Sequence, residues 1–457
     1  MQLIYYPLCN ILEKINRVLW SFPVILLIFS VMIYLGVKTR FPQLHPIRLA
    51  ECFFGRGGGG SRVRAVSSAL AAAMGTGNII GVASAIAAGG AGAVIWMDIA
   101  AFFGMAAAYA ENFLGVRYMH DAPAPAYFSK LRGGRYIYGI YTLLCAASAC
   151  LMGNMIQGSA VCKAGSELTG ADIRIVSLTA AGVFGLLLAG GGKRLQSAAG
   201  KLIIPASVIY IASSAAVILV CRESFAPAVH DMLSSALGIR AAGGGICGYI
   251  LKNAVSAGLR RGIFSNEAGL GSSVLLHTAS GCDDPDRVGK WAAFEVFIDT
   301  VVCCTLTALV LLVSGADCSG SETAAVTYAF GSALGAFGRL LVPLTLMVFA
   351  FASMLGWSCC GRRAVAGLFG DEKRNGEIAC HVFGAVQAVL MYIGGTADNP
   401  VLWDAADMVN VLMLAVNITA VTIVYTRYTG DKERMIYDEN SISKPVNAGV
   451  EPICERR

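Results

Sequence analysis

Long runs of apolar residues, each about 18 to 25 residues in length, dominate this sequence and are separated by short polar stretches. An α-helix of roughly 20 apolar residues crosses the hydrocarbon core of a bilayer. Of the 457 residues, 56% are hydrophobic and only 14% are charged, a balance that would leave a soluble globule with excess apolar surface. The strands of outer-membrane barrels are about half as long and alternate in polarity, which excludes that class. The sequence therefore predicts an all-α membrane protein.

We expect about eleven transmembrane helices, and a single membrane domain accounts for the chain because no polar segment is long enough for a soluble domain. The first run follows Lys14 and Arg17 but is too long for a signal-peptide core, so it is predicted to be a retained span. The predicted spans cover residues 19–37, 64–85, 90–116, 136–160, 174–190, 200–221, 249–277, 289–314, 335–356, 378–395 and 404–426.

Lysine and arginine residues concentrate in the loops after the first, third, fifth, seventh and ninth spans and in the C-terminal tail. Positively charged loops tend to stay in the cytoplasm. We therefore expect a multi-pass protein of a bacterial inner (plasma) membrane, with its N-terminus outside and its C-terminus in the cytoplasm. The net charge of +6 reflects this topology and indicates no nucleic-acid partner. No cysteine and histidine residues have zinc-site spacing, and no cofactor is expected.

Two spans carry glycine and polar residues in the middle of an otherwise apolar run. Residues 64–85 contain Gly75-Thr76-Gly77-Asn78, and residues 249–277 contain Phe-Ser-Asn-Glu-Ala-Gly-Leu-Gly at 264–271. Unpaired backbone groups are costly in hydrocarbon, so an unwound helix is tolerated only where it lines a protein cavity or binds a ligand. The two breaks thus predict one internal site.

The two interrupted spans also begin corresponding sets of five spans, residues 64–221 and 249–426. A five-span unit repeated in the sequence enters the membrane in opposite orientations, which is the inverted-repeat plan of many secondary transporters. In that plan the substrate binds at mid-membrane between the repeats. Residues 1–63 add an N-terminal helix and a cytoplasmic loop, and residues 427–457 form a cytoplasmic tail.

The first break offers groups that suit a charged ligand. Unwinding near Gly75 to Asn78 frees backbone N–H groups at the start of the outer half-helix, where the helix dipole attracts a carboxylate. The carbonyl groups freed on the other side can bind a hard cation such as Na⁺, together with Thr76 or Asn78. The alternative is that the glycines of this segment only allow close helix packing.

Several side chains inside the predicted spans are costly to place there. Each carboxylate costs roughly 2.5–3.5 kcal/mol at mid-membrane on insertion scales, and it can bind a cation, carry a proton or cap a backbone break. We favour a function for Glu267, in the second break, either at the ligand or in holding the unwound loop. Two amides, Asn154 and Gln157, need partners that a cavity ligand would provide. The five carboxylates are Asp98, Glu111, Glu267, Glu295 and Asp299.

Near the end of the ninth span, Ser353 is suited to face a cation and Trp357 to form a wall of the pocket. A lone tryptophan near a span end is also typical of a membrane-interface anchor.

The strings around both breaks strongly resemble the alanine/glycine:cation symporter family, and the resemblance covers nearly the whole chain. It rests on the following segments: Gly75 to Ala83, Gly89 to Met97, Gly153 to Gln157, Arg261 to Gly269, Phe297 to Thr300, Phe349 to Trp357, and Trp403-Asp404 with Asp407 and Asn410. The resemblance implies a LeuT-like five-plus-five core with two broken helices and one extra N-terminal helix. It also implies uptake of alanine or glycine driven by Na⁺ and occasionally by H⁺.

The resemblance further implies roles for individual positions between the two broken spans. Thr76, Gly77 and Asn78 would meet the carboxylate or the cation, while Gln157 and Trp357 would line the pocket. Phe264, Ser265 and Asn266 would close the pocket from the other break. Ser353 would complete a sodium site with the span that holds Gly75 and Thr76, and Glu267 and Asp299 are structural or gating candidates.

The sequence departs from the family pattern at several positions, which leaves the substrate and the ion open. At Ala352 the hydroxyl that frequently stands beside Ser353 is missing, and this removes one possible sodium ligand. The other departures are Ala91, Asp98, Gly158, Cys359, Cys360 and Arg362. The alternatives are an H⁺-coupled or other-substrate amino acid permease, a channel, and an intramembrane enzyme that uses Ser265 and Glu267. No histidine or lysine stands near that pair to complete a nucleophile, so we expect no enzyme.

Overall fold

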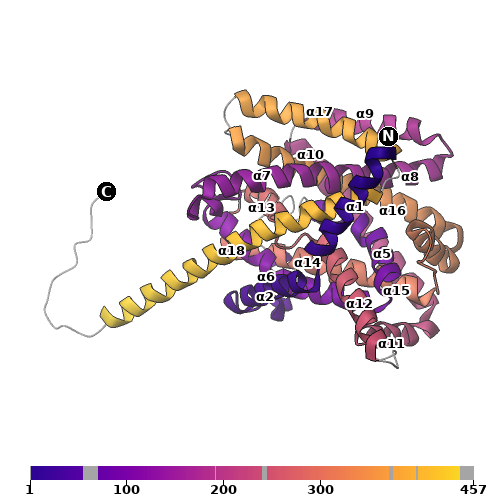
Figure 1. Ribbon diagram of the computed structural model, residues 1–457, viewed down its shortest axis with the longest axis horizontal. Helices are drawn as coiled ribbons and strands as arrows, with labels where there is room; N and C mark the ends of the chain where they lie inside the picture. The colour runs from indigo at the N-terminus through magenta and orange to yellow at the C-terminus, as the bar shows by residue number, and fades with distance from the viewer. Residues whose placement is uncertain are drawn as a thin grey trace.

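The computed structural model describes residues 2–54, 70–190, 192–238, 244–369, 374–397 and 400–442, which form a bundle of helices (Figure 1). The elements are α1 (Gln2–Leu19), α2 (Phe22–Lys38), η1 (Pro42–Leu44), α3 (Pro46–Phe54), η2 (Thr76–Asn78), α5 (Ile80–Gly89), α6 (Gly92–Arg117), η3 (Ala126–Lys130), α7 (Gly134–Cys150), η4 (Leu151–Ile156), α8 (Gln157–Thr169), α9 (Ile173–Ala189), α10 (Gly192–Val220), η5 (Arg222–Ser224), α11 (Phe225–Ala236), α12 (Gly244–Asn266), α13 (Ser272–His277), η6 (Thr278–Ser280), α14 (Pro285–Val296), η7 (Phe297–Cys304), α15 (Thr305–Val313), α16 (Glu322–Phe369), α17 (Arg374–Thr396) and α18 (Pro400–Ile442).

Each predicted span coincides with a helix or with a pair of helices joined at a break. Within the described residues, seven helices are long and apolar enough to cross a membrane. An eighth span arises if Asn10–Leu19 and Phe22–Lys38, which meet at an angle of 46°, are counted together. The other three predicted spans are α9, which is 17 residues long, and the two interrupted spans. In the first of these, residues 64–69 lie outside the described residues.

Some predicted polar segments are helical as well. Residues 38–63, between the first and second predicted spans, contain the short helix α3, and residues 222–248, between the sixth and seventh, contain α11. Helix α16 extends well beyond the predicted span and bends at Gly335, whose φ of 63° lies in the left-handed region that favours glycine. Helix α18 continues to Ile442, so the first part of the predicted tail is helical. Residues 55–63 of the predicted cytoplasmic loop lie outside the described residues.

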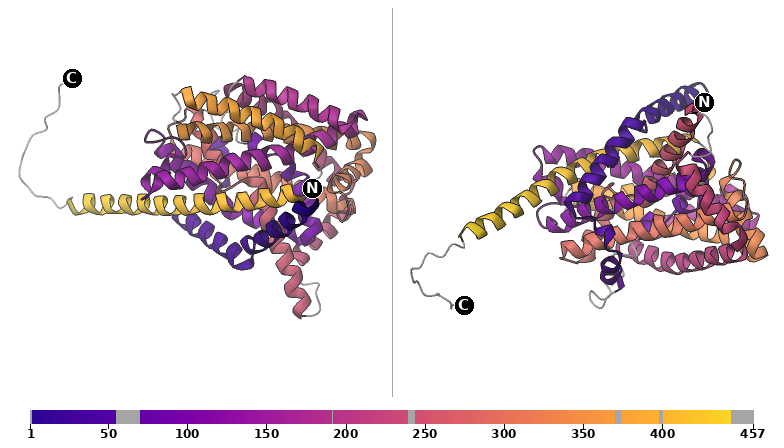
Figure 2. Two further views of the ribbon diagram at one scale, coloured as in Figure 1. Left: turned by 45° about the horizontal axis from the view of Figure 1, so that its top comes forward. Right: turned by 90° about the horizontal axis from the view of Figure 1, so that it is seen from below.

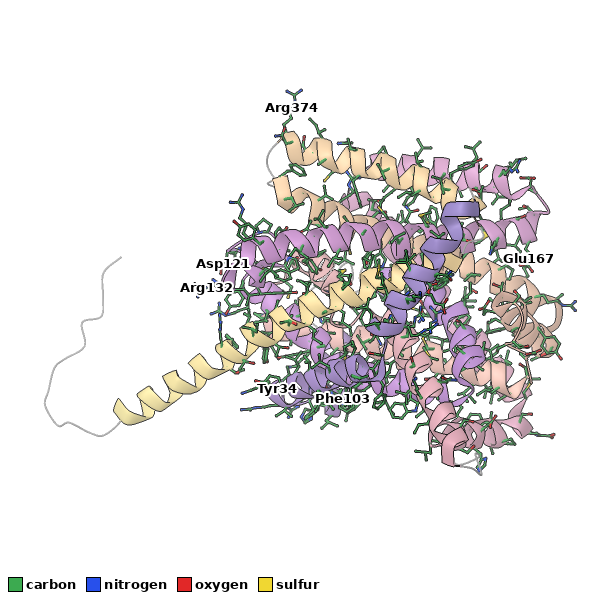
Figure 3. The ribbon with its side chains drawn as sticks, in the orientation of Figure 1. Tyr34, Phe103, Asp121, Arg132, Glu167 and Arg374 are labelled. Atoms are coloured by element: carbon green, nitrogen blue, oxygen red, sulfur yellow. The ribbon has the colours of Figure 1, made fainter. Side chains whose placement is uncertain are left out.

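Loops that are predicted to lie on different sides of the membrane lie at opposite ends of the bundle. Helix α18 projects beyond the bundle at one end (Figure 2). Asp121 and Arg132, in the loop predicted to be cytoplasmic, lie at that same end, and Glu167, in a loop predicted to be external, lies at the opposite end (Figure 3). The relative placement of the loops follows the prediction, while the assignment of one end to the cytoplasm remains a prediction.

The broken spans lie at the centre of the packing. Helix α6 packs against α12 and α14, and α16 packs against α7, α8 and α10. The 3₁₀ turn η2 contacts α12, α16 and η7, while α5 contacts α12 and α16. Two segments, η4 and η7, are π-helical. Because π-helical turns commonly mark functional sites, their position beside the two breaks directs attention to this region.

Candidate functional site

The first break brings together residues from three elements. The chain leaves the helical conformation at Met74 and Gly75, and the Thr76 N–H donates to Gln157 Oε1 at 3.0 Å. Ser353 Oγ donates to the Ala72 carbonyl oxygen at 2.9 Å. A Cβ atom at Gly75 would lie 2.9 Å from Gln157 Oε1 and 3.1 Å from Ser353 Cβ, so glycine is required for this close approach. The proposed substrate and sodium ligands of this break are therefore neighbours.

The second break spans residues 267–271 and turns sharply. Glu267 has a φ of 55°, which is uncommon for a residue other than glycine, and Gly269 and Gly271 also have positive φ values. The Gly271 N–H donates to Glu111 Oε2 at 3.0 Å, and Asn417 Nδ2 donates to the Gly269 carbonyl at 2.8 Å and to Glu111 Oε2 at 2.7 Å. Two polar side chains thus satisfy the backbone groups that the break leaves unpaired.

Asp299 joins the two breaks. Its side chain is fully buried in η7 and accepts from Asn78 Nδ2 at 2.8 Å and from Ser265 Oγ at 2.9 Å. Thr300 Oγ1 donates to the same carboxylate at 3.0 Å. Gly77 lies against Ser265, where an added Cβ would approach the Ser265 Cα to 3.1 Å. Gly77, Asn78, Ser265 and Asp299 therefore form a second cluster beside the first break, which we call the Asp299 cluster.

Trp357 and Glu267 contact each other directly. Trp357 Nε1 donates to Glu267 Oε1 at 2.7 Å, and Ser272 Oγ donates to Glu267 Oε2 at 2.8 Å. Trp357 is fully buried, so the interpretation as a membrane-interface anchor is wrong. An added Cβ at Gly153 would lie 2.3 Å from Trp357 Cβ, which shows how tightly η4 packs on α16 here. Glu267 thus connects the start of the second break to Ser272, at its far end, and to α16, as expected of a residue that holds the unwound loop.

Two buried polar atoms at the breaks have no hydrogen-bond partner among the described residues. They are Thr76 Oγ1 and Asn266 Nδ2. Asn266 uses its Oδ1 to accept from the Ala268 N–H at 3.1 Å, and it borders a cavity of about 20 Å³ together with Glu267 and Glu295. Buried polar groups are rarely left unpaired, so these atoms mark positions that a ligand, ion or water would complete.

Other polar residues found in the sequence lie apart from these clusters. Asn154 Nδ2 donates to the Gln387 carbonyl on α17 at 2.9 Å, while its buried Oδ1 has no hydrogen-bond partner among the described residues. Asp98 accepts from Thr305 Oγ1 at 3.0 Å and borders a large apolar pocket on α6. Glu295 pairs with His277 at 3.0 Å.

An arginine bridge joins α12 to α18 and was not predicted from the sequence. The Arg260 side chain, on α12, pairs with Asp407 and lies 3.4 Å from Asp404, both on α18. We call these three residues the Arg260 bridge. One turn further along α12, the Phe264 ring contacts the Trp403 ring, with centroids 5.2 Å apart and ring planes tilted by 38°. The sequence feature that could have indicated this bridge is the pair of acidic residues, Asp404 and Asp407, in the Trp403 segment, together with the two arginines that precede the second break.

The model of the sodium:alanine symporter family matches residues 6–439. The chain belongs to this family. As a member of the sodium:alanine symporter family, it is a multi-pass membrane protein of a sodium-coupled amino acid symport family and is not an enzyme, as the sequence predicted. In agreement, Ser265 Oγ donates to Asp299, whereas Glu267 is held by Ser272 and Trp357.

Relatives within the family differ in substrate. The sodium/alanine symporter AgcS of Methanococcus maripaludis is 31% identical over 442 residues, which cover 91% of this chain and 94% of that protein. The probable sodium/glutamine symporter GlnT of Bacillus subtilis is 30% identical, over 91% of this chain and 89% of that protein. Among solved structures, MhsT in complex with L-phenylalanine matches with a TM-score of 0.59 at 15% identity, over 80% of this chain and 89% of that one. This likeness confirms the LeuT-like fold with broken helices.

Proposed function

We propose that this member of the sodium:alanine symporter family imports a small neutral amino acid, alanine or glycine, together with Na⁺ by alternating access. It would do so across a bacterial plasma membrane, with its N-terminus outside. The observation that carries the proposal is the meeting of two unwound helix segments with Gln157, Ser353 and Trp357 at the centre of the bundle. Helix ends aimed at one internal point are suited to a zwitterion and a cation.

The first break supports binding of the amino acid carboxylate. The first backbone N–H groups of α5 lie at the N-terminal end of the helix, where the helix dipole favours negative charge. Thr76 contributes an unpartnered hydroxyl, and Gln157 already contacts the Thr76 N–H. The close approaches at Gly75 and Gly153 leave little room beside Gln157 and Trp357, which favours a small side chain on the substrate.

The region between Ser353 and the first break supports binding of Na⁺. Ser353 Oγ and the Ala72 carbonyl oxygen are 2.9 Å apart, and the unwound segment at Gly75 and Thr76 adds further carbonyl groups nearby. Hydroxyl and carbonyl oxygens are the ligands that hard cations prefer. The Ala352 side chain has no oxygen atom, so backbone carbonyl groups must supply the ligand that a second hydroxyl would otherwise provide.

Uptake into proteoliposomes tests the proposed function. Labelled alanine or glycine is expected to accumulate under an inward Na⁺ gradient and to fall to the leak rate when choline replaces Na⁺. A panel that includes glutamine and serine measures the substrate preference. Accumulation that ignores Na⁺ and follows an inward pH gradient would overturn sodium coupling and identify H⁺ as the coupling ion. Asp299 would then be the first carboxylate to test.

Changes at two neighbouring positions should alter the sodium requirement in opposite directions. Ser353→Ala removes a proposed ligand and is expected to raise the Na⁺ concentration for half-maximal uptake about tenfold. Ala352→Ser restores a hydroxyl beside it and is expected to lower that concentration. The measurement is the initial uptake rate against Na⁺ at saturating amino acid. An unchanged Na⁺ dependence in both variants would place the cation elsewhere.

A further inference from the structure

A cavity separate from the two breaks lies beside the Arg260 bridge. It has a volume of about 240 Å³ and is lined by residues of α5 and α12: Ser84, Ala88, Asn253, Ser256, Ala257, Arg260 and Arg261. The lining residues of α12 precede Phe264, and a rise of about 1.5 Å per residue places Ser256 roughly 14 Å along the helix from Ser265. Along α12, the Arg260 bridge and the Phe264–Trp403 pair therefore lie between the Ser256 end of this cavity and the second break.

The two arginines of the cavity differ in what they contact. Arg260 is engaged by Asp404 and Asp407. The Arg261 guanidinium lies over the Trp403 ring, 4.9 Å from its centroid, and its buried Nη1 has no hydrogen-bond partner among the described residues. A buried guanidinium N–H without an acceptor is costly, and a carboxylate is the acceptor that fits it best.

The charges and the size of the cavity indicate which carboxylate it would accept. The charged groups that act on Arg261 are Arg260, Asp404, Asp407 and Glu322, so that, with Arg261 itself, two positive charges face three negative charges. Such a surrounding favours a zwitterion over a multiply charged anion. The volume is below the range of roughly 300–1,000 Å³ that is usual for drug-sized ligands, which suits a small molecule. Ser84, Asn253 and Ser256 add polar groups for the rest of that molecule.

We propose that this cavity is an entry site that binds the zwitterionic amino acid through its carboxylate and Arg261. The amino acid then reaches the first break when the Arg260 bridge and the Phe264–Trp403 pair separate. The entry site rests on the proposed function and adds a second binding position for the same substrate. Arg261 is the residue that holds the substrate there, whereas Arg260 belongs to the bridge that closes the way inward.

Two changes in the cavity test the entry site in reconstituted full-length protein. Arg261→Gln is expected to raise the KM for labelled alanine about tenfold while Vmax stays within about twofold, since the loss of a charge-assisted contact affects capture rather than translocation. Ser256→Phe, which fills the cavity without changing its charge, is expected to raise KM in the same direction. Lys252→Gln is the matched control, because it removes one positive charge from an exposed position of the same helix.

Equilibrium binding of labelled alanine in detergent supplies the second readout. The wild type is expected to bind two molecules per chain and Arg261→Gln one. A wild-type KM in both cavity variants, together with one molecule per wild-type chain, would overturn the entry site and leave the proposed function standing. Absence of any amino acid uptake by the wild type would instead overturn the proposed function.

Discussion

Replacement of Asp299 with alanine is expected to reduce amino acid uptake by at least about 100-fold, because three buried donors lose their common acceptor. Asn78 Nδ2 and Ser265 Oγ come from the two broken spans, and both donate to this carboxylate. Without it, Asn78 Nδ2 keeps the backbone carbonyl oxygen of residue 299, at 2.9 Å, but the hydrogen-bonded link from Asn78 through the carboxylate to Ser265 is lost. The measurement is the initial uptake rate normalised to the amount of folded protein in the membrane.

Asp98→Ala is the matched control for this change. Asp98 is also an aspartate within a predicted span and also accepts from a threonine hydroxyl, at Thr305. It lies beside the apolar pocket of α6 and is not a member of the Asp299 cluster. We expect uptake by this variant to stay within about threefold of the wild type, as is usual for changes that leave the transported ligands untouched. Equal losses in the two variants would show that the Asp299 effect is a general cost of removing a carboxylate from a span.

Replacement of Glu111 with alanine is expected to destabilise the protein by about 3 kcal/mol, because the Gly271 N–H and the weaker donor at Gly269 lose their acceptor inside the bundle. In a chain of this length that corresponds to a decrease in the melting temperature of about 3 °C. Detergent-solubilised protein can be followed by thermal unfolding.

Glu111→Gln separates the loss of acceptors from the loss of charge. The glutamine side chain keeps one acceptor oxygen for the N–H groups of the second break, so its decrease in melting temperature should be about half that of Glu111→Ala. Labelled alanine uptake by the glutamine variant should remain measurable. A melting temperature equal to the wild type in the alanine variant would show that other groups or water satisfy this break.

The spans and the two breaks could be predicted from the sequence because they depend on local features. Run length and apolar composition locate the helices, and glycine among polar residues locates the breaks. The positions of Gly75, Gln157 and Ser353 next to one another also follow, but only through resemblance to a known family. Composition alone does not say which segments of the chain meet.

The partners of the polar side chains could not be predicted, because they are set by packing between distant segments. Asp299 meets Asn78 across 221 positions of the chain, and Glu111 meets Gly271 across 160. Trp357 is near the end of its predicted span but fully buried, since α16 continues past that end. The Nδ2 atom of Asn154 found its partner on α17, 233 positions away in the chain, because an amide N–H pairs with any nearby carbonyl group.

The hydrogen bond between the Thr76 N–H and Gln157 has a thermodynamic consequence for the proposed symport. Thr76 stands between the region of Ser353, where Na⁺ is proposed to bind, and the pocket wall at Gln157. Binding of either ligand, Na⁺ or the amino acid, then orders the backbone segment around Thr76, which the other ligand also contacts. Linkage is reciprocal, so the factor by which Na⁺ tightens amino acid binding must equal the factor by which the amino acid tightens Na⁺ binding. Neither ligand alone would bring the segment to the closed arrangement as often as the two together.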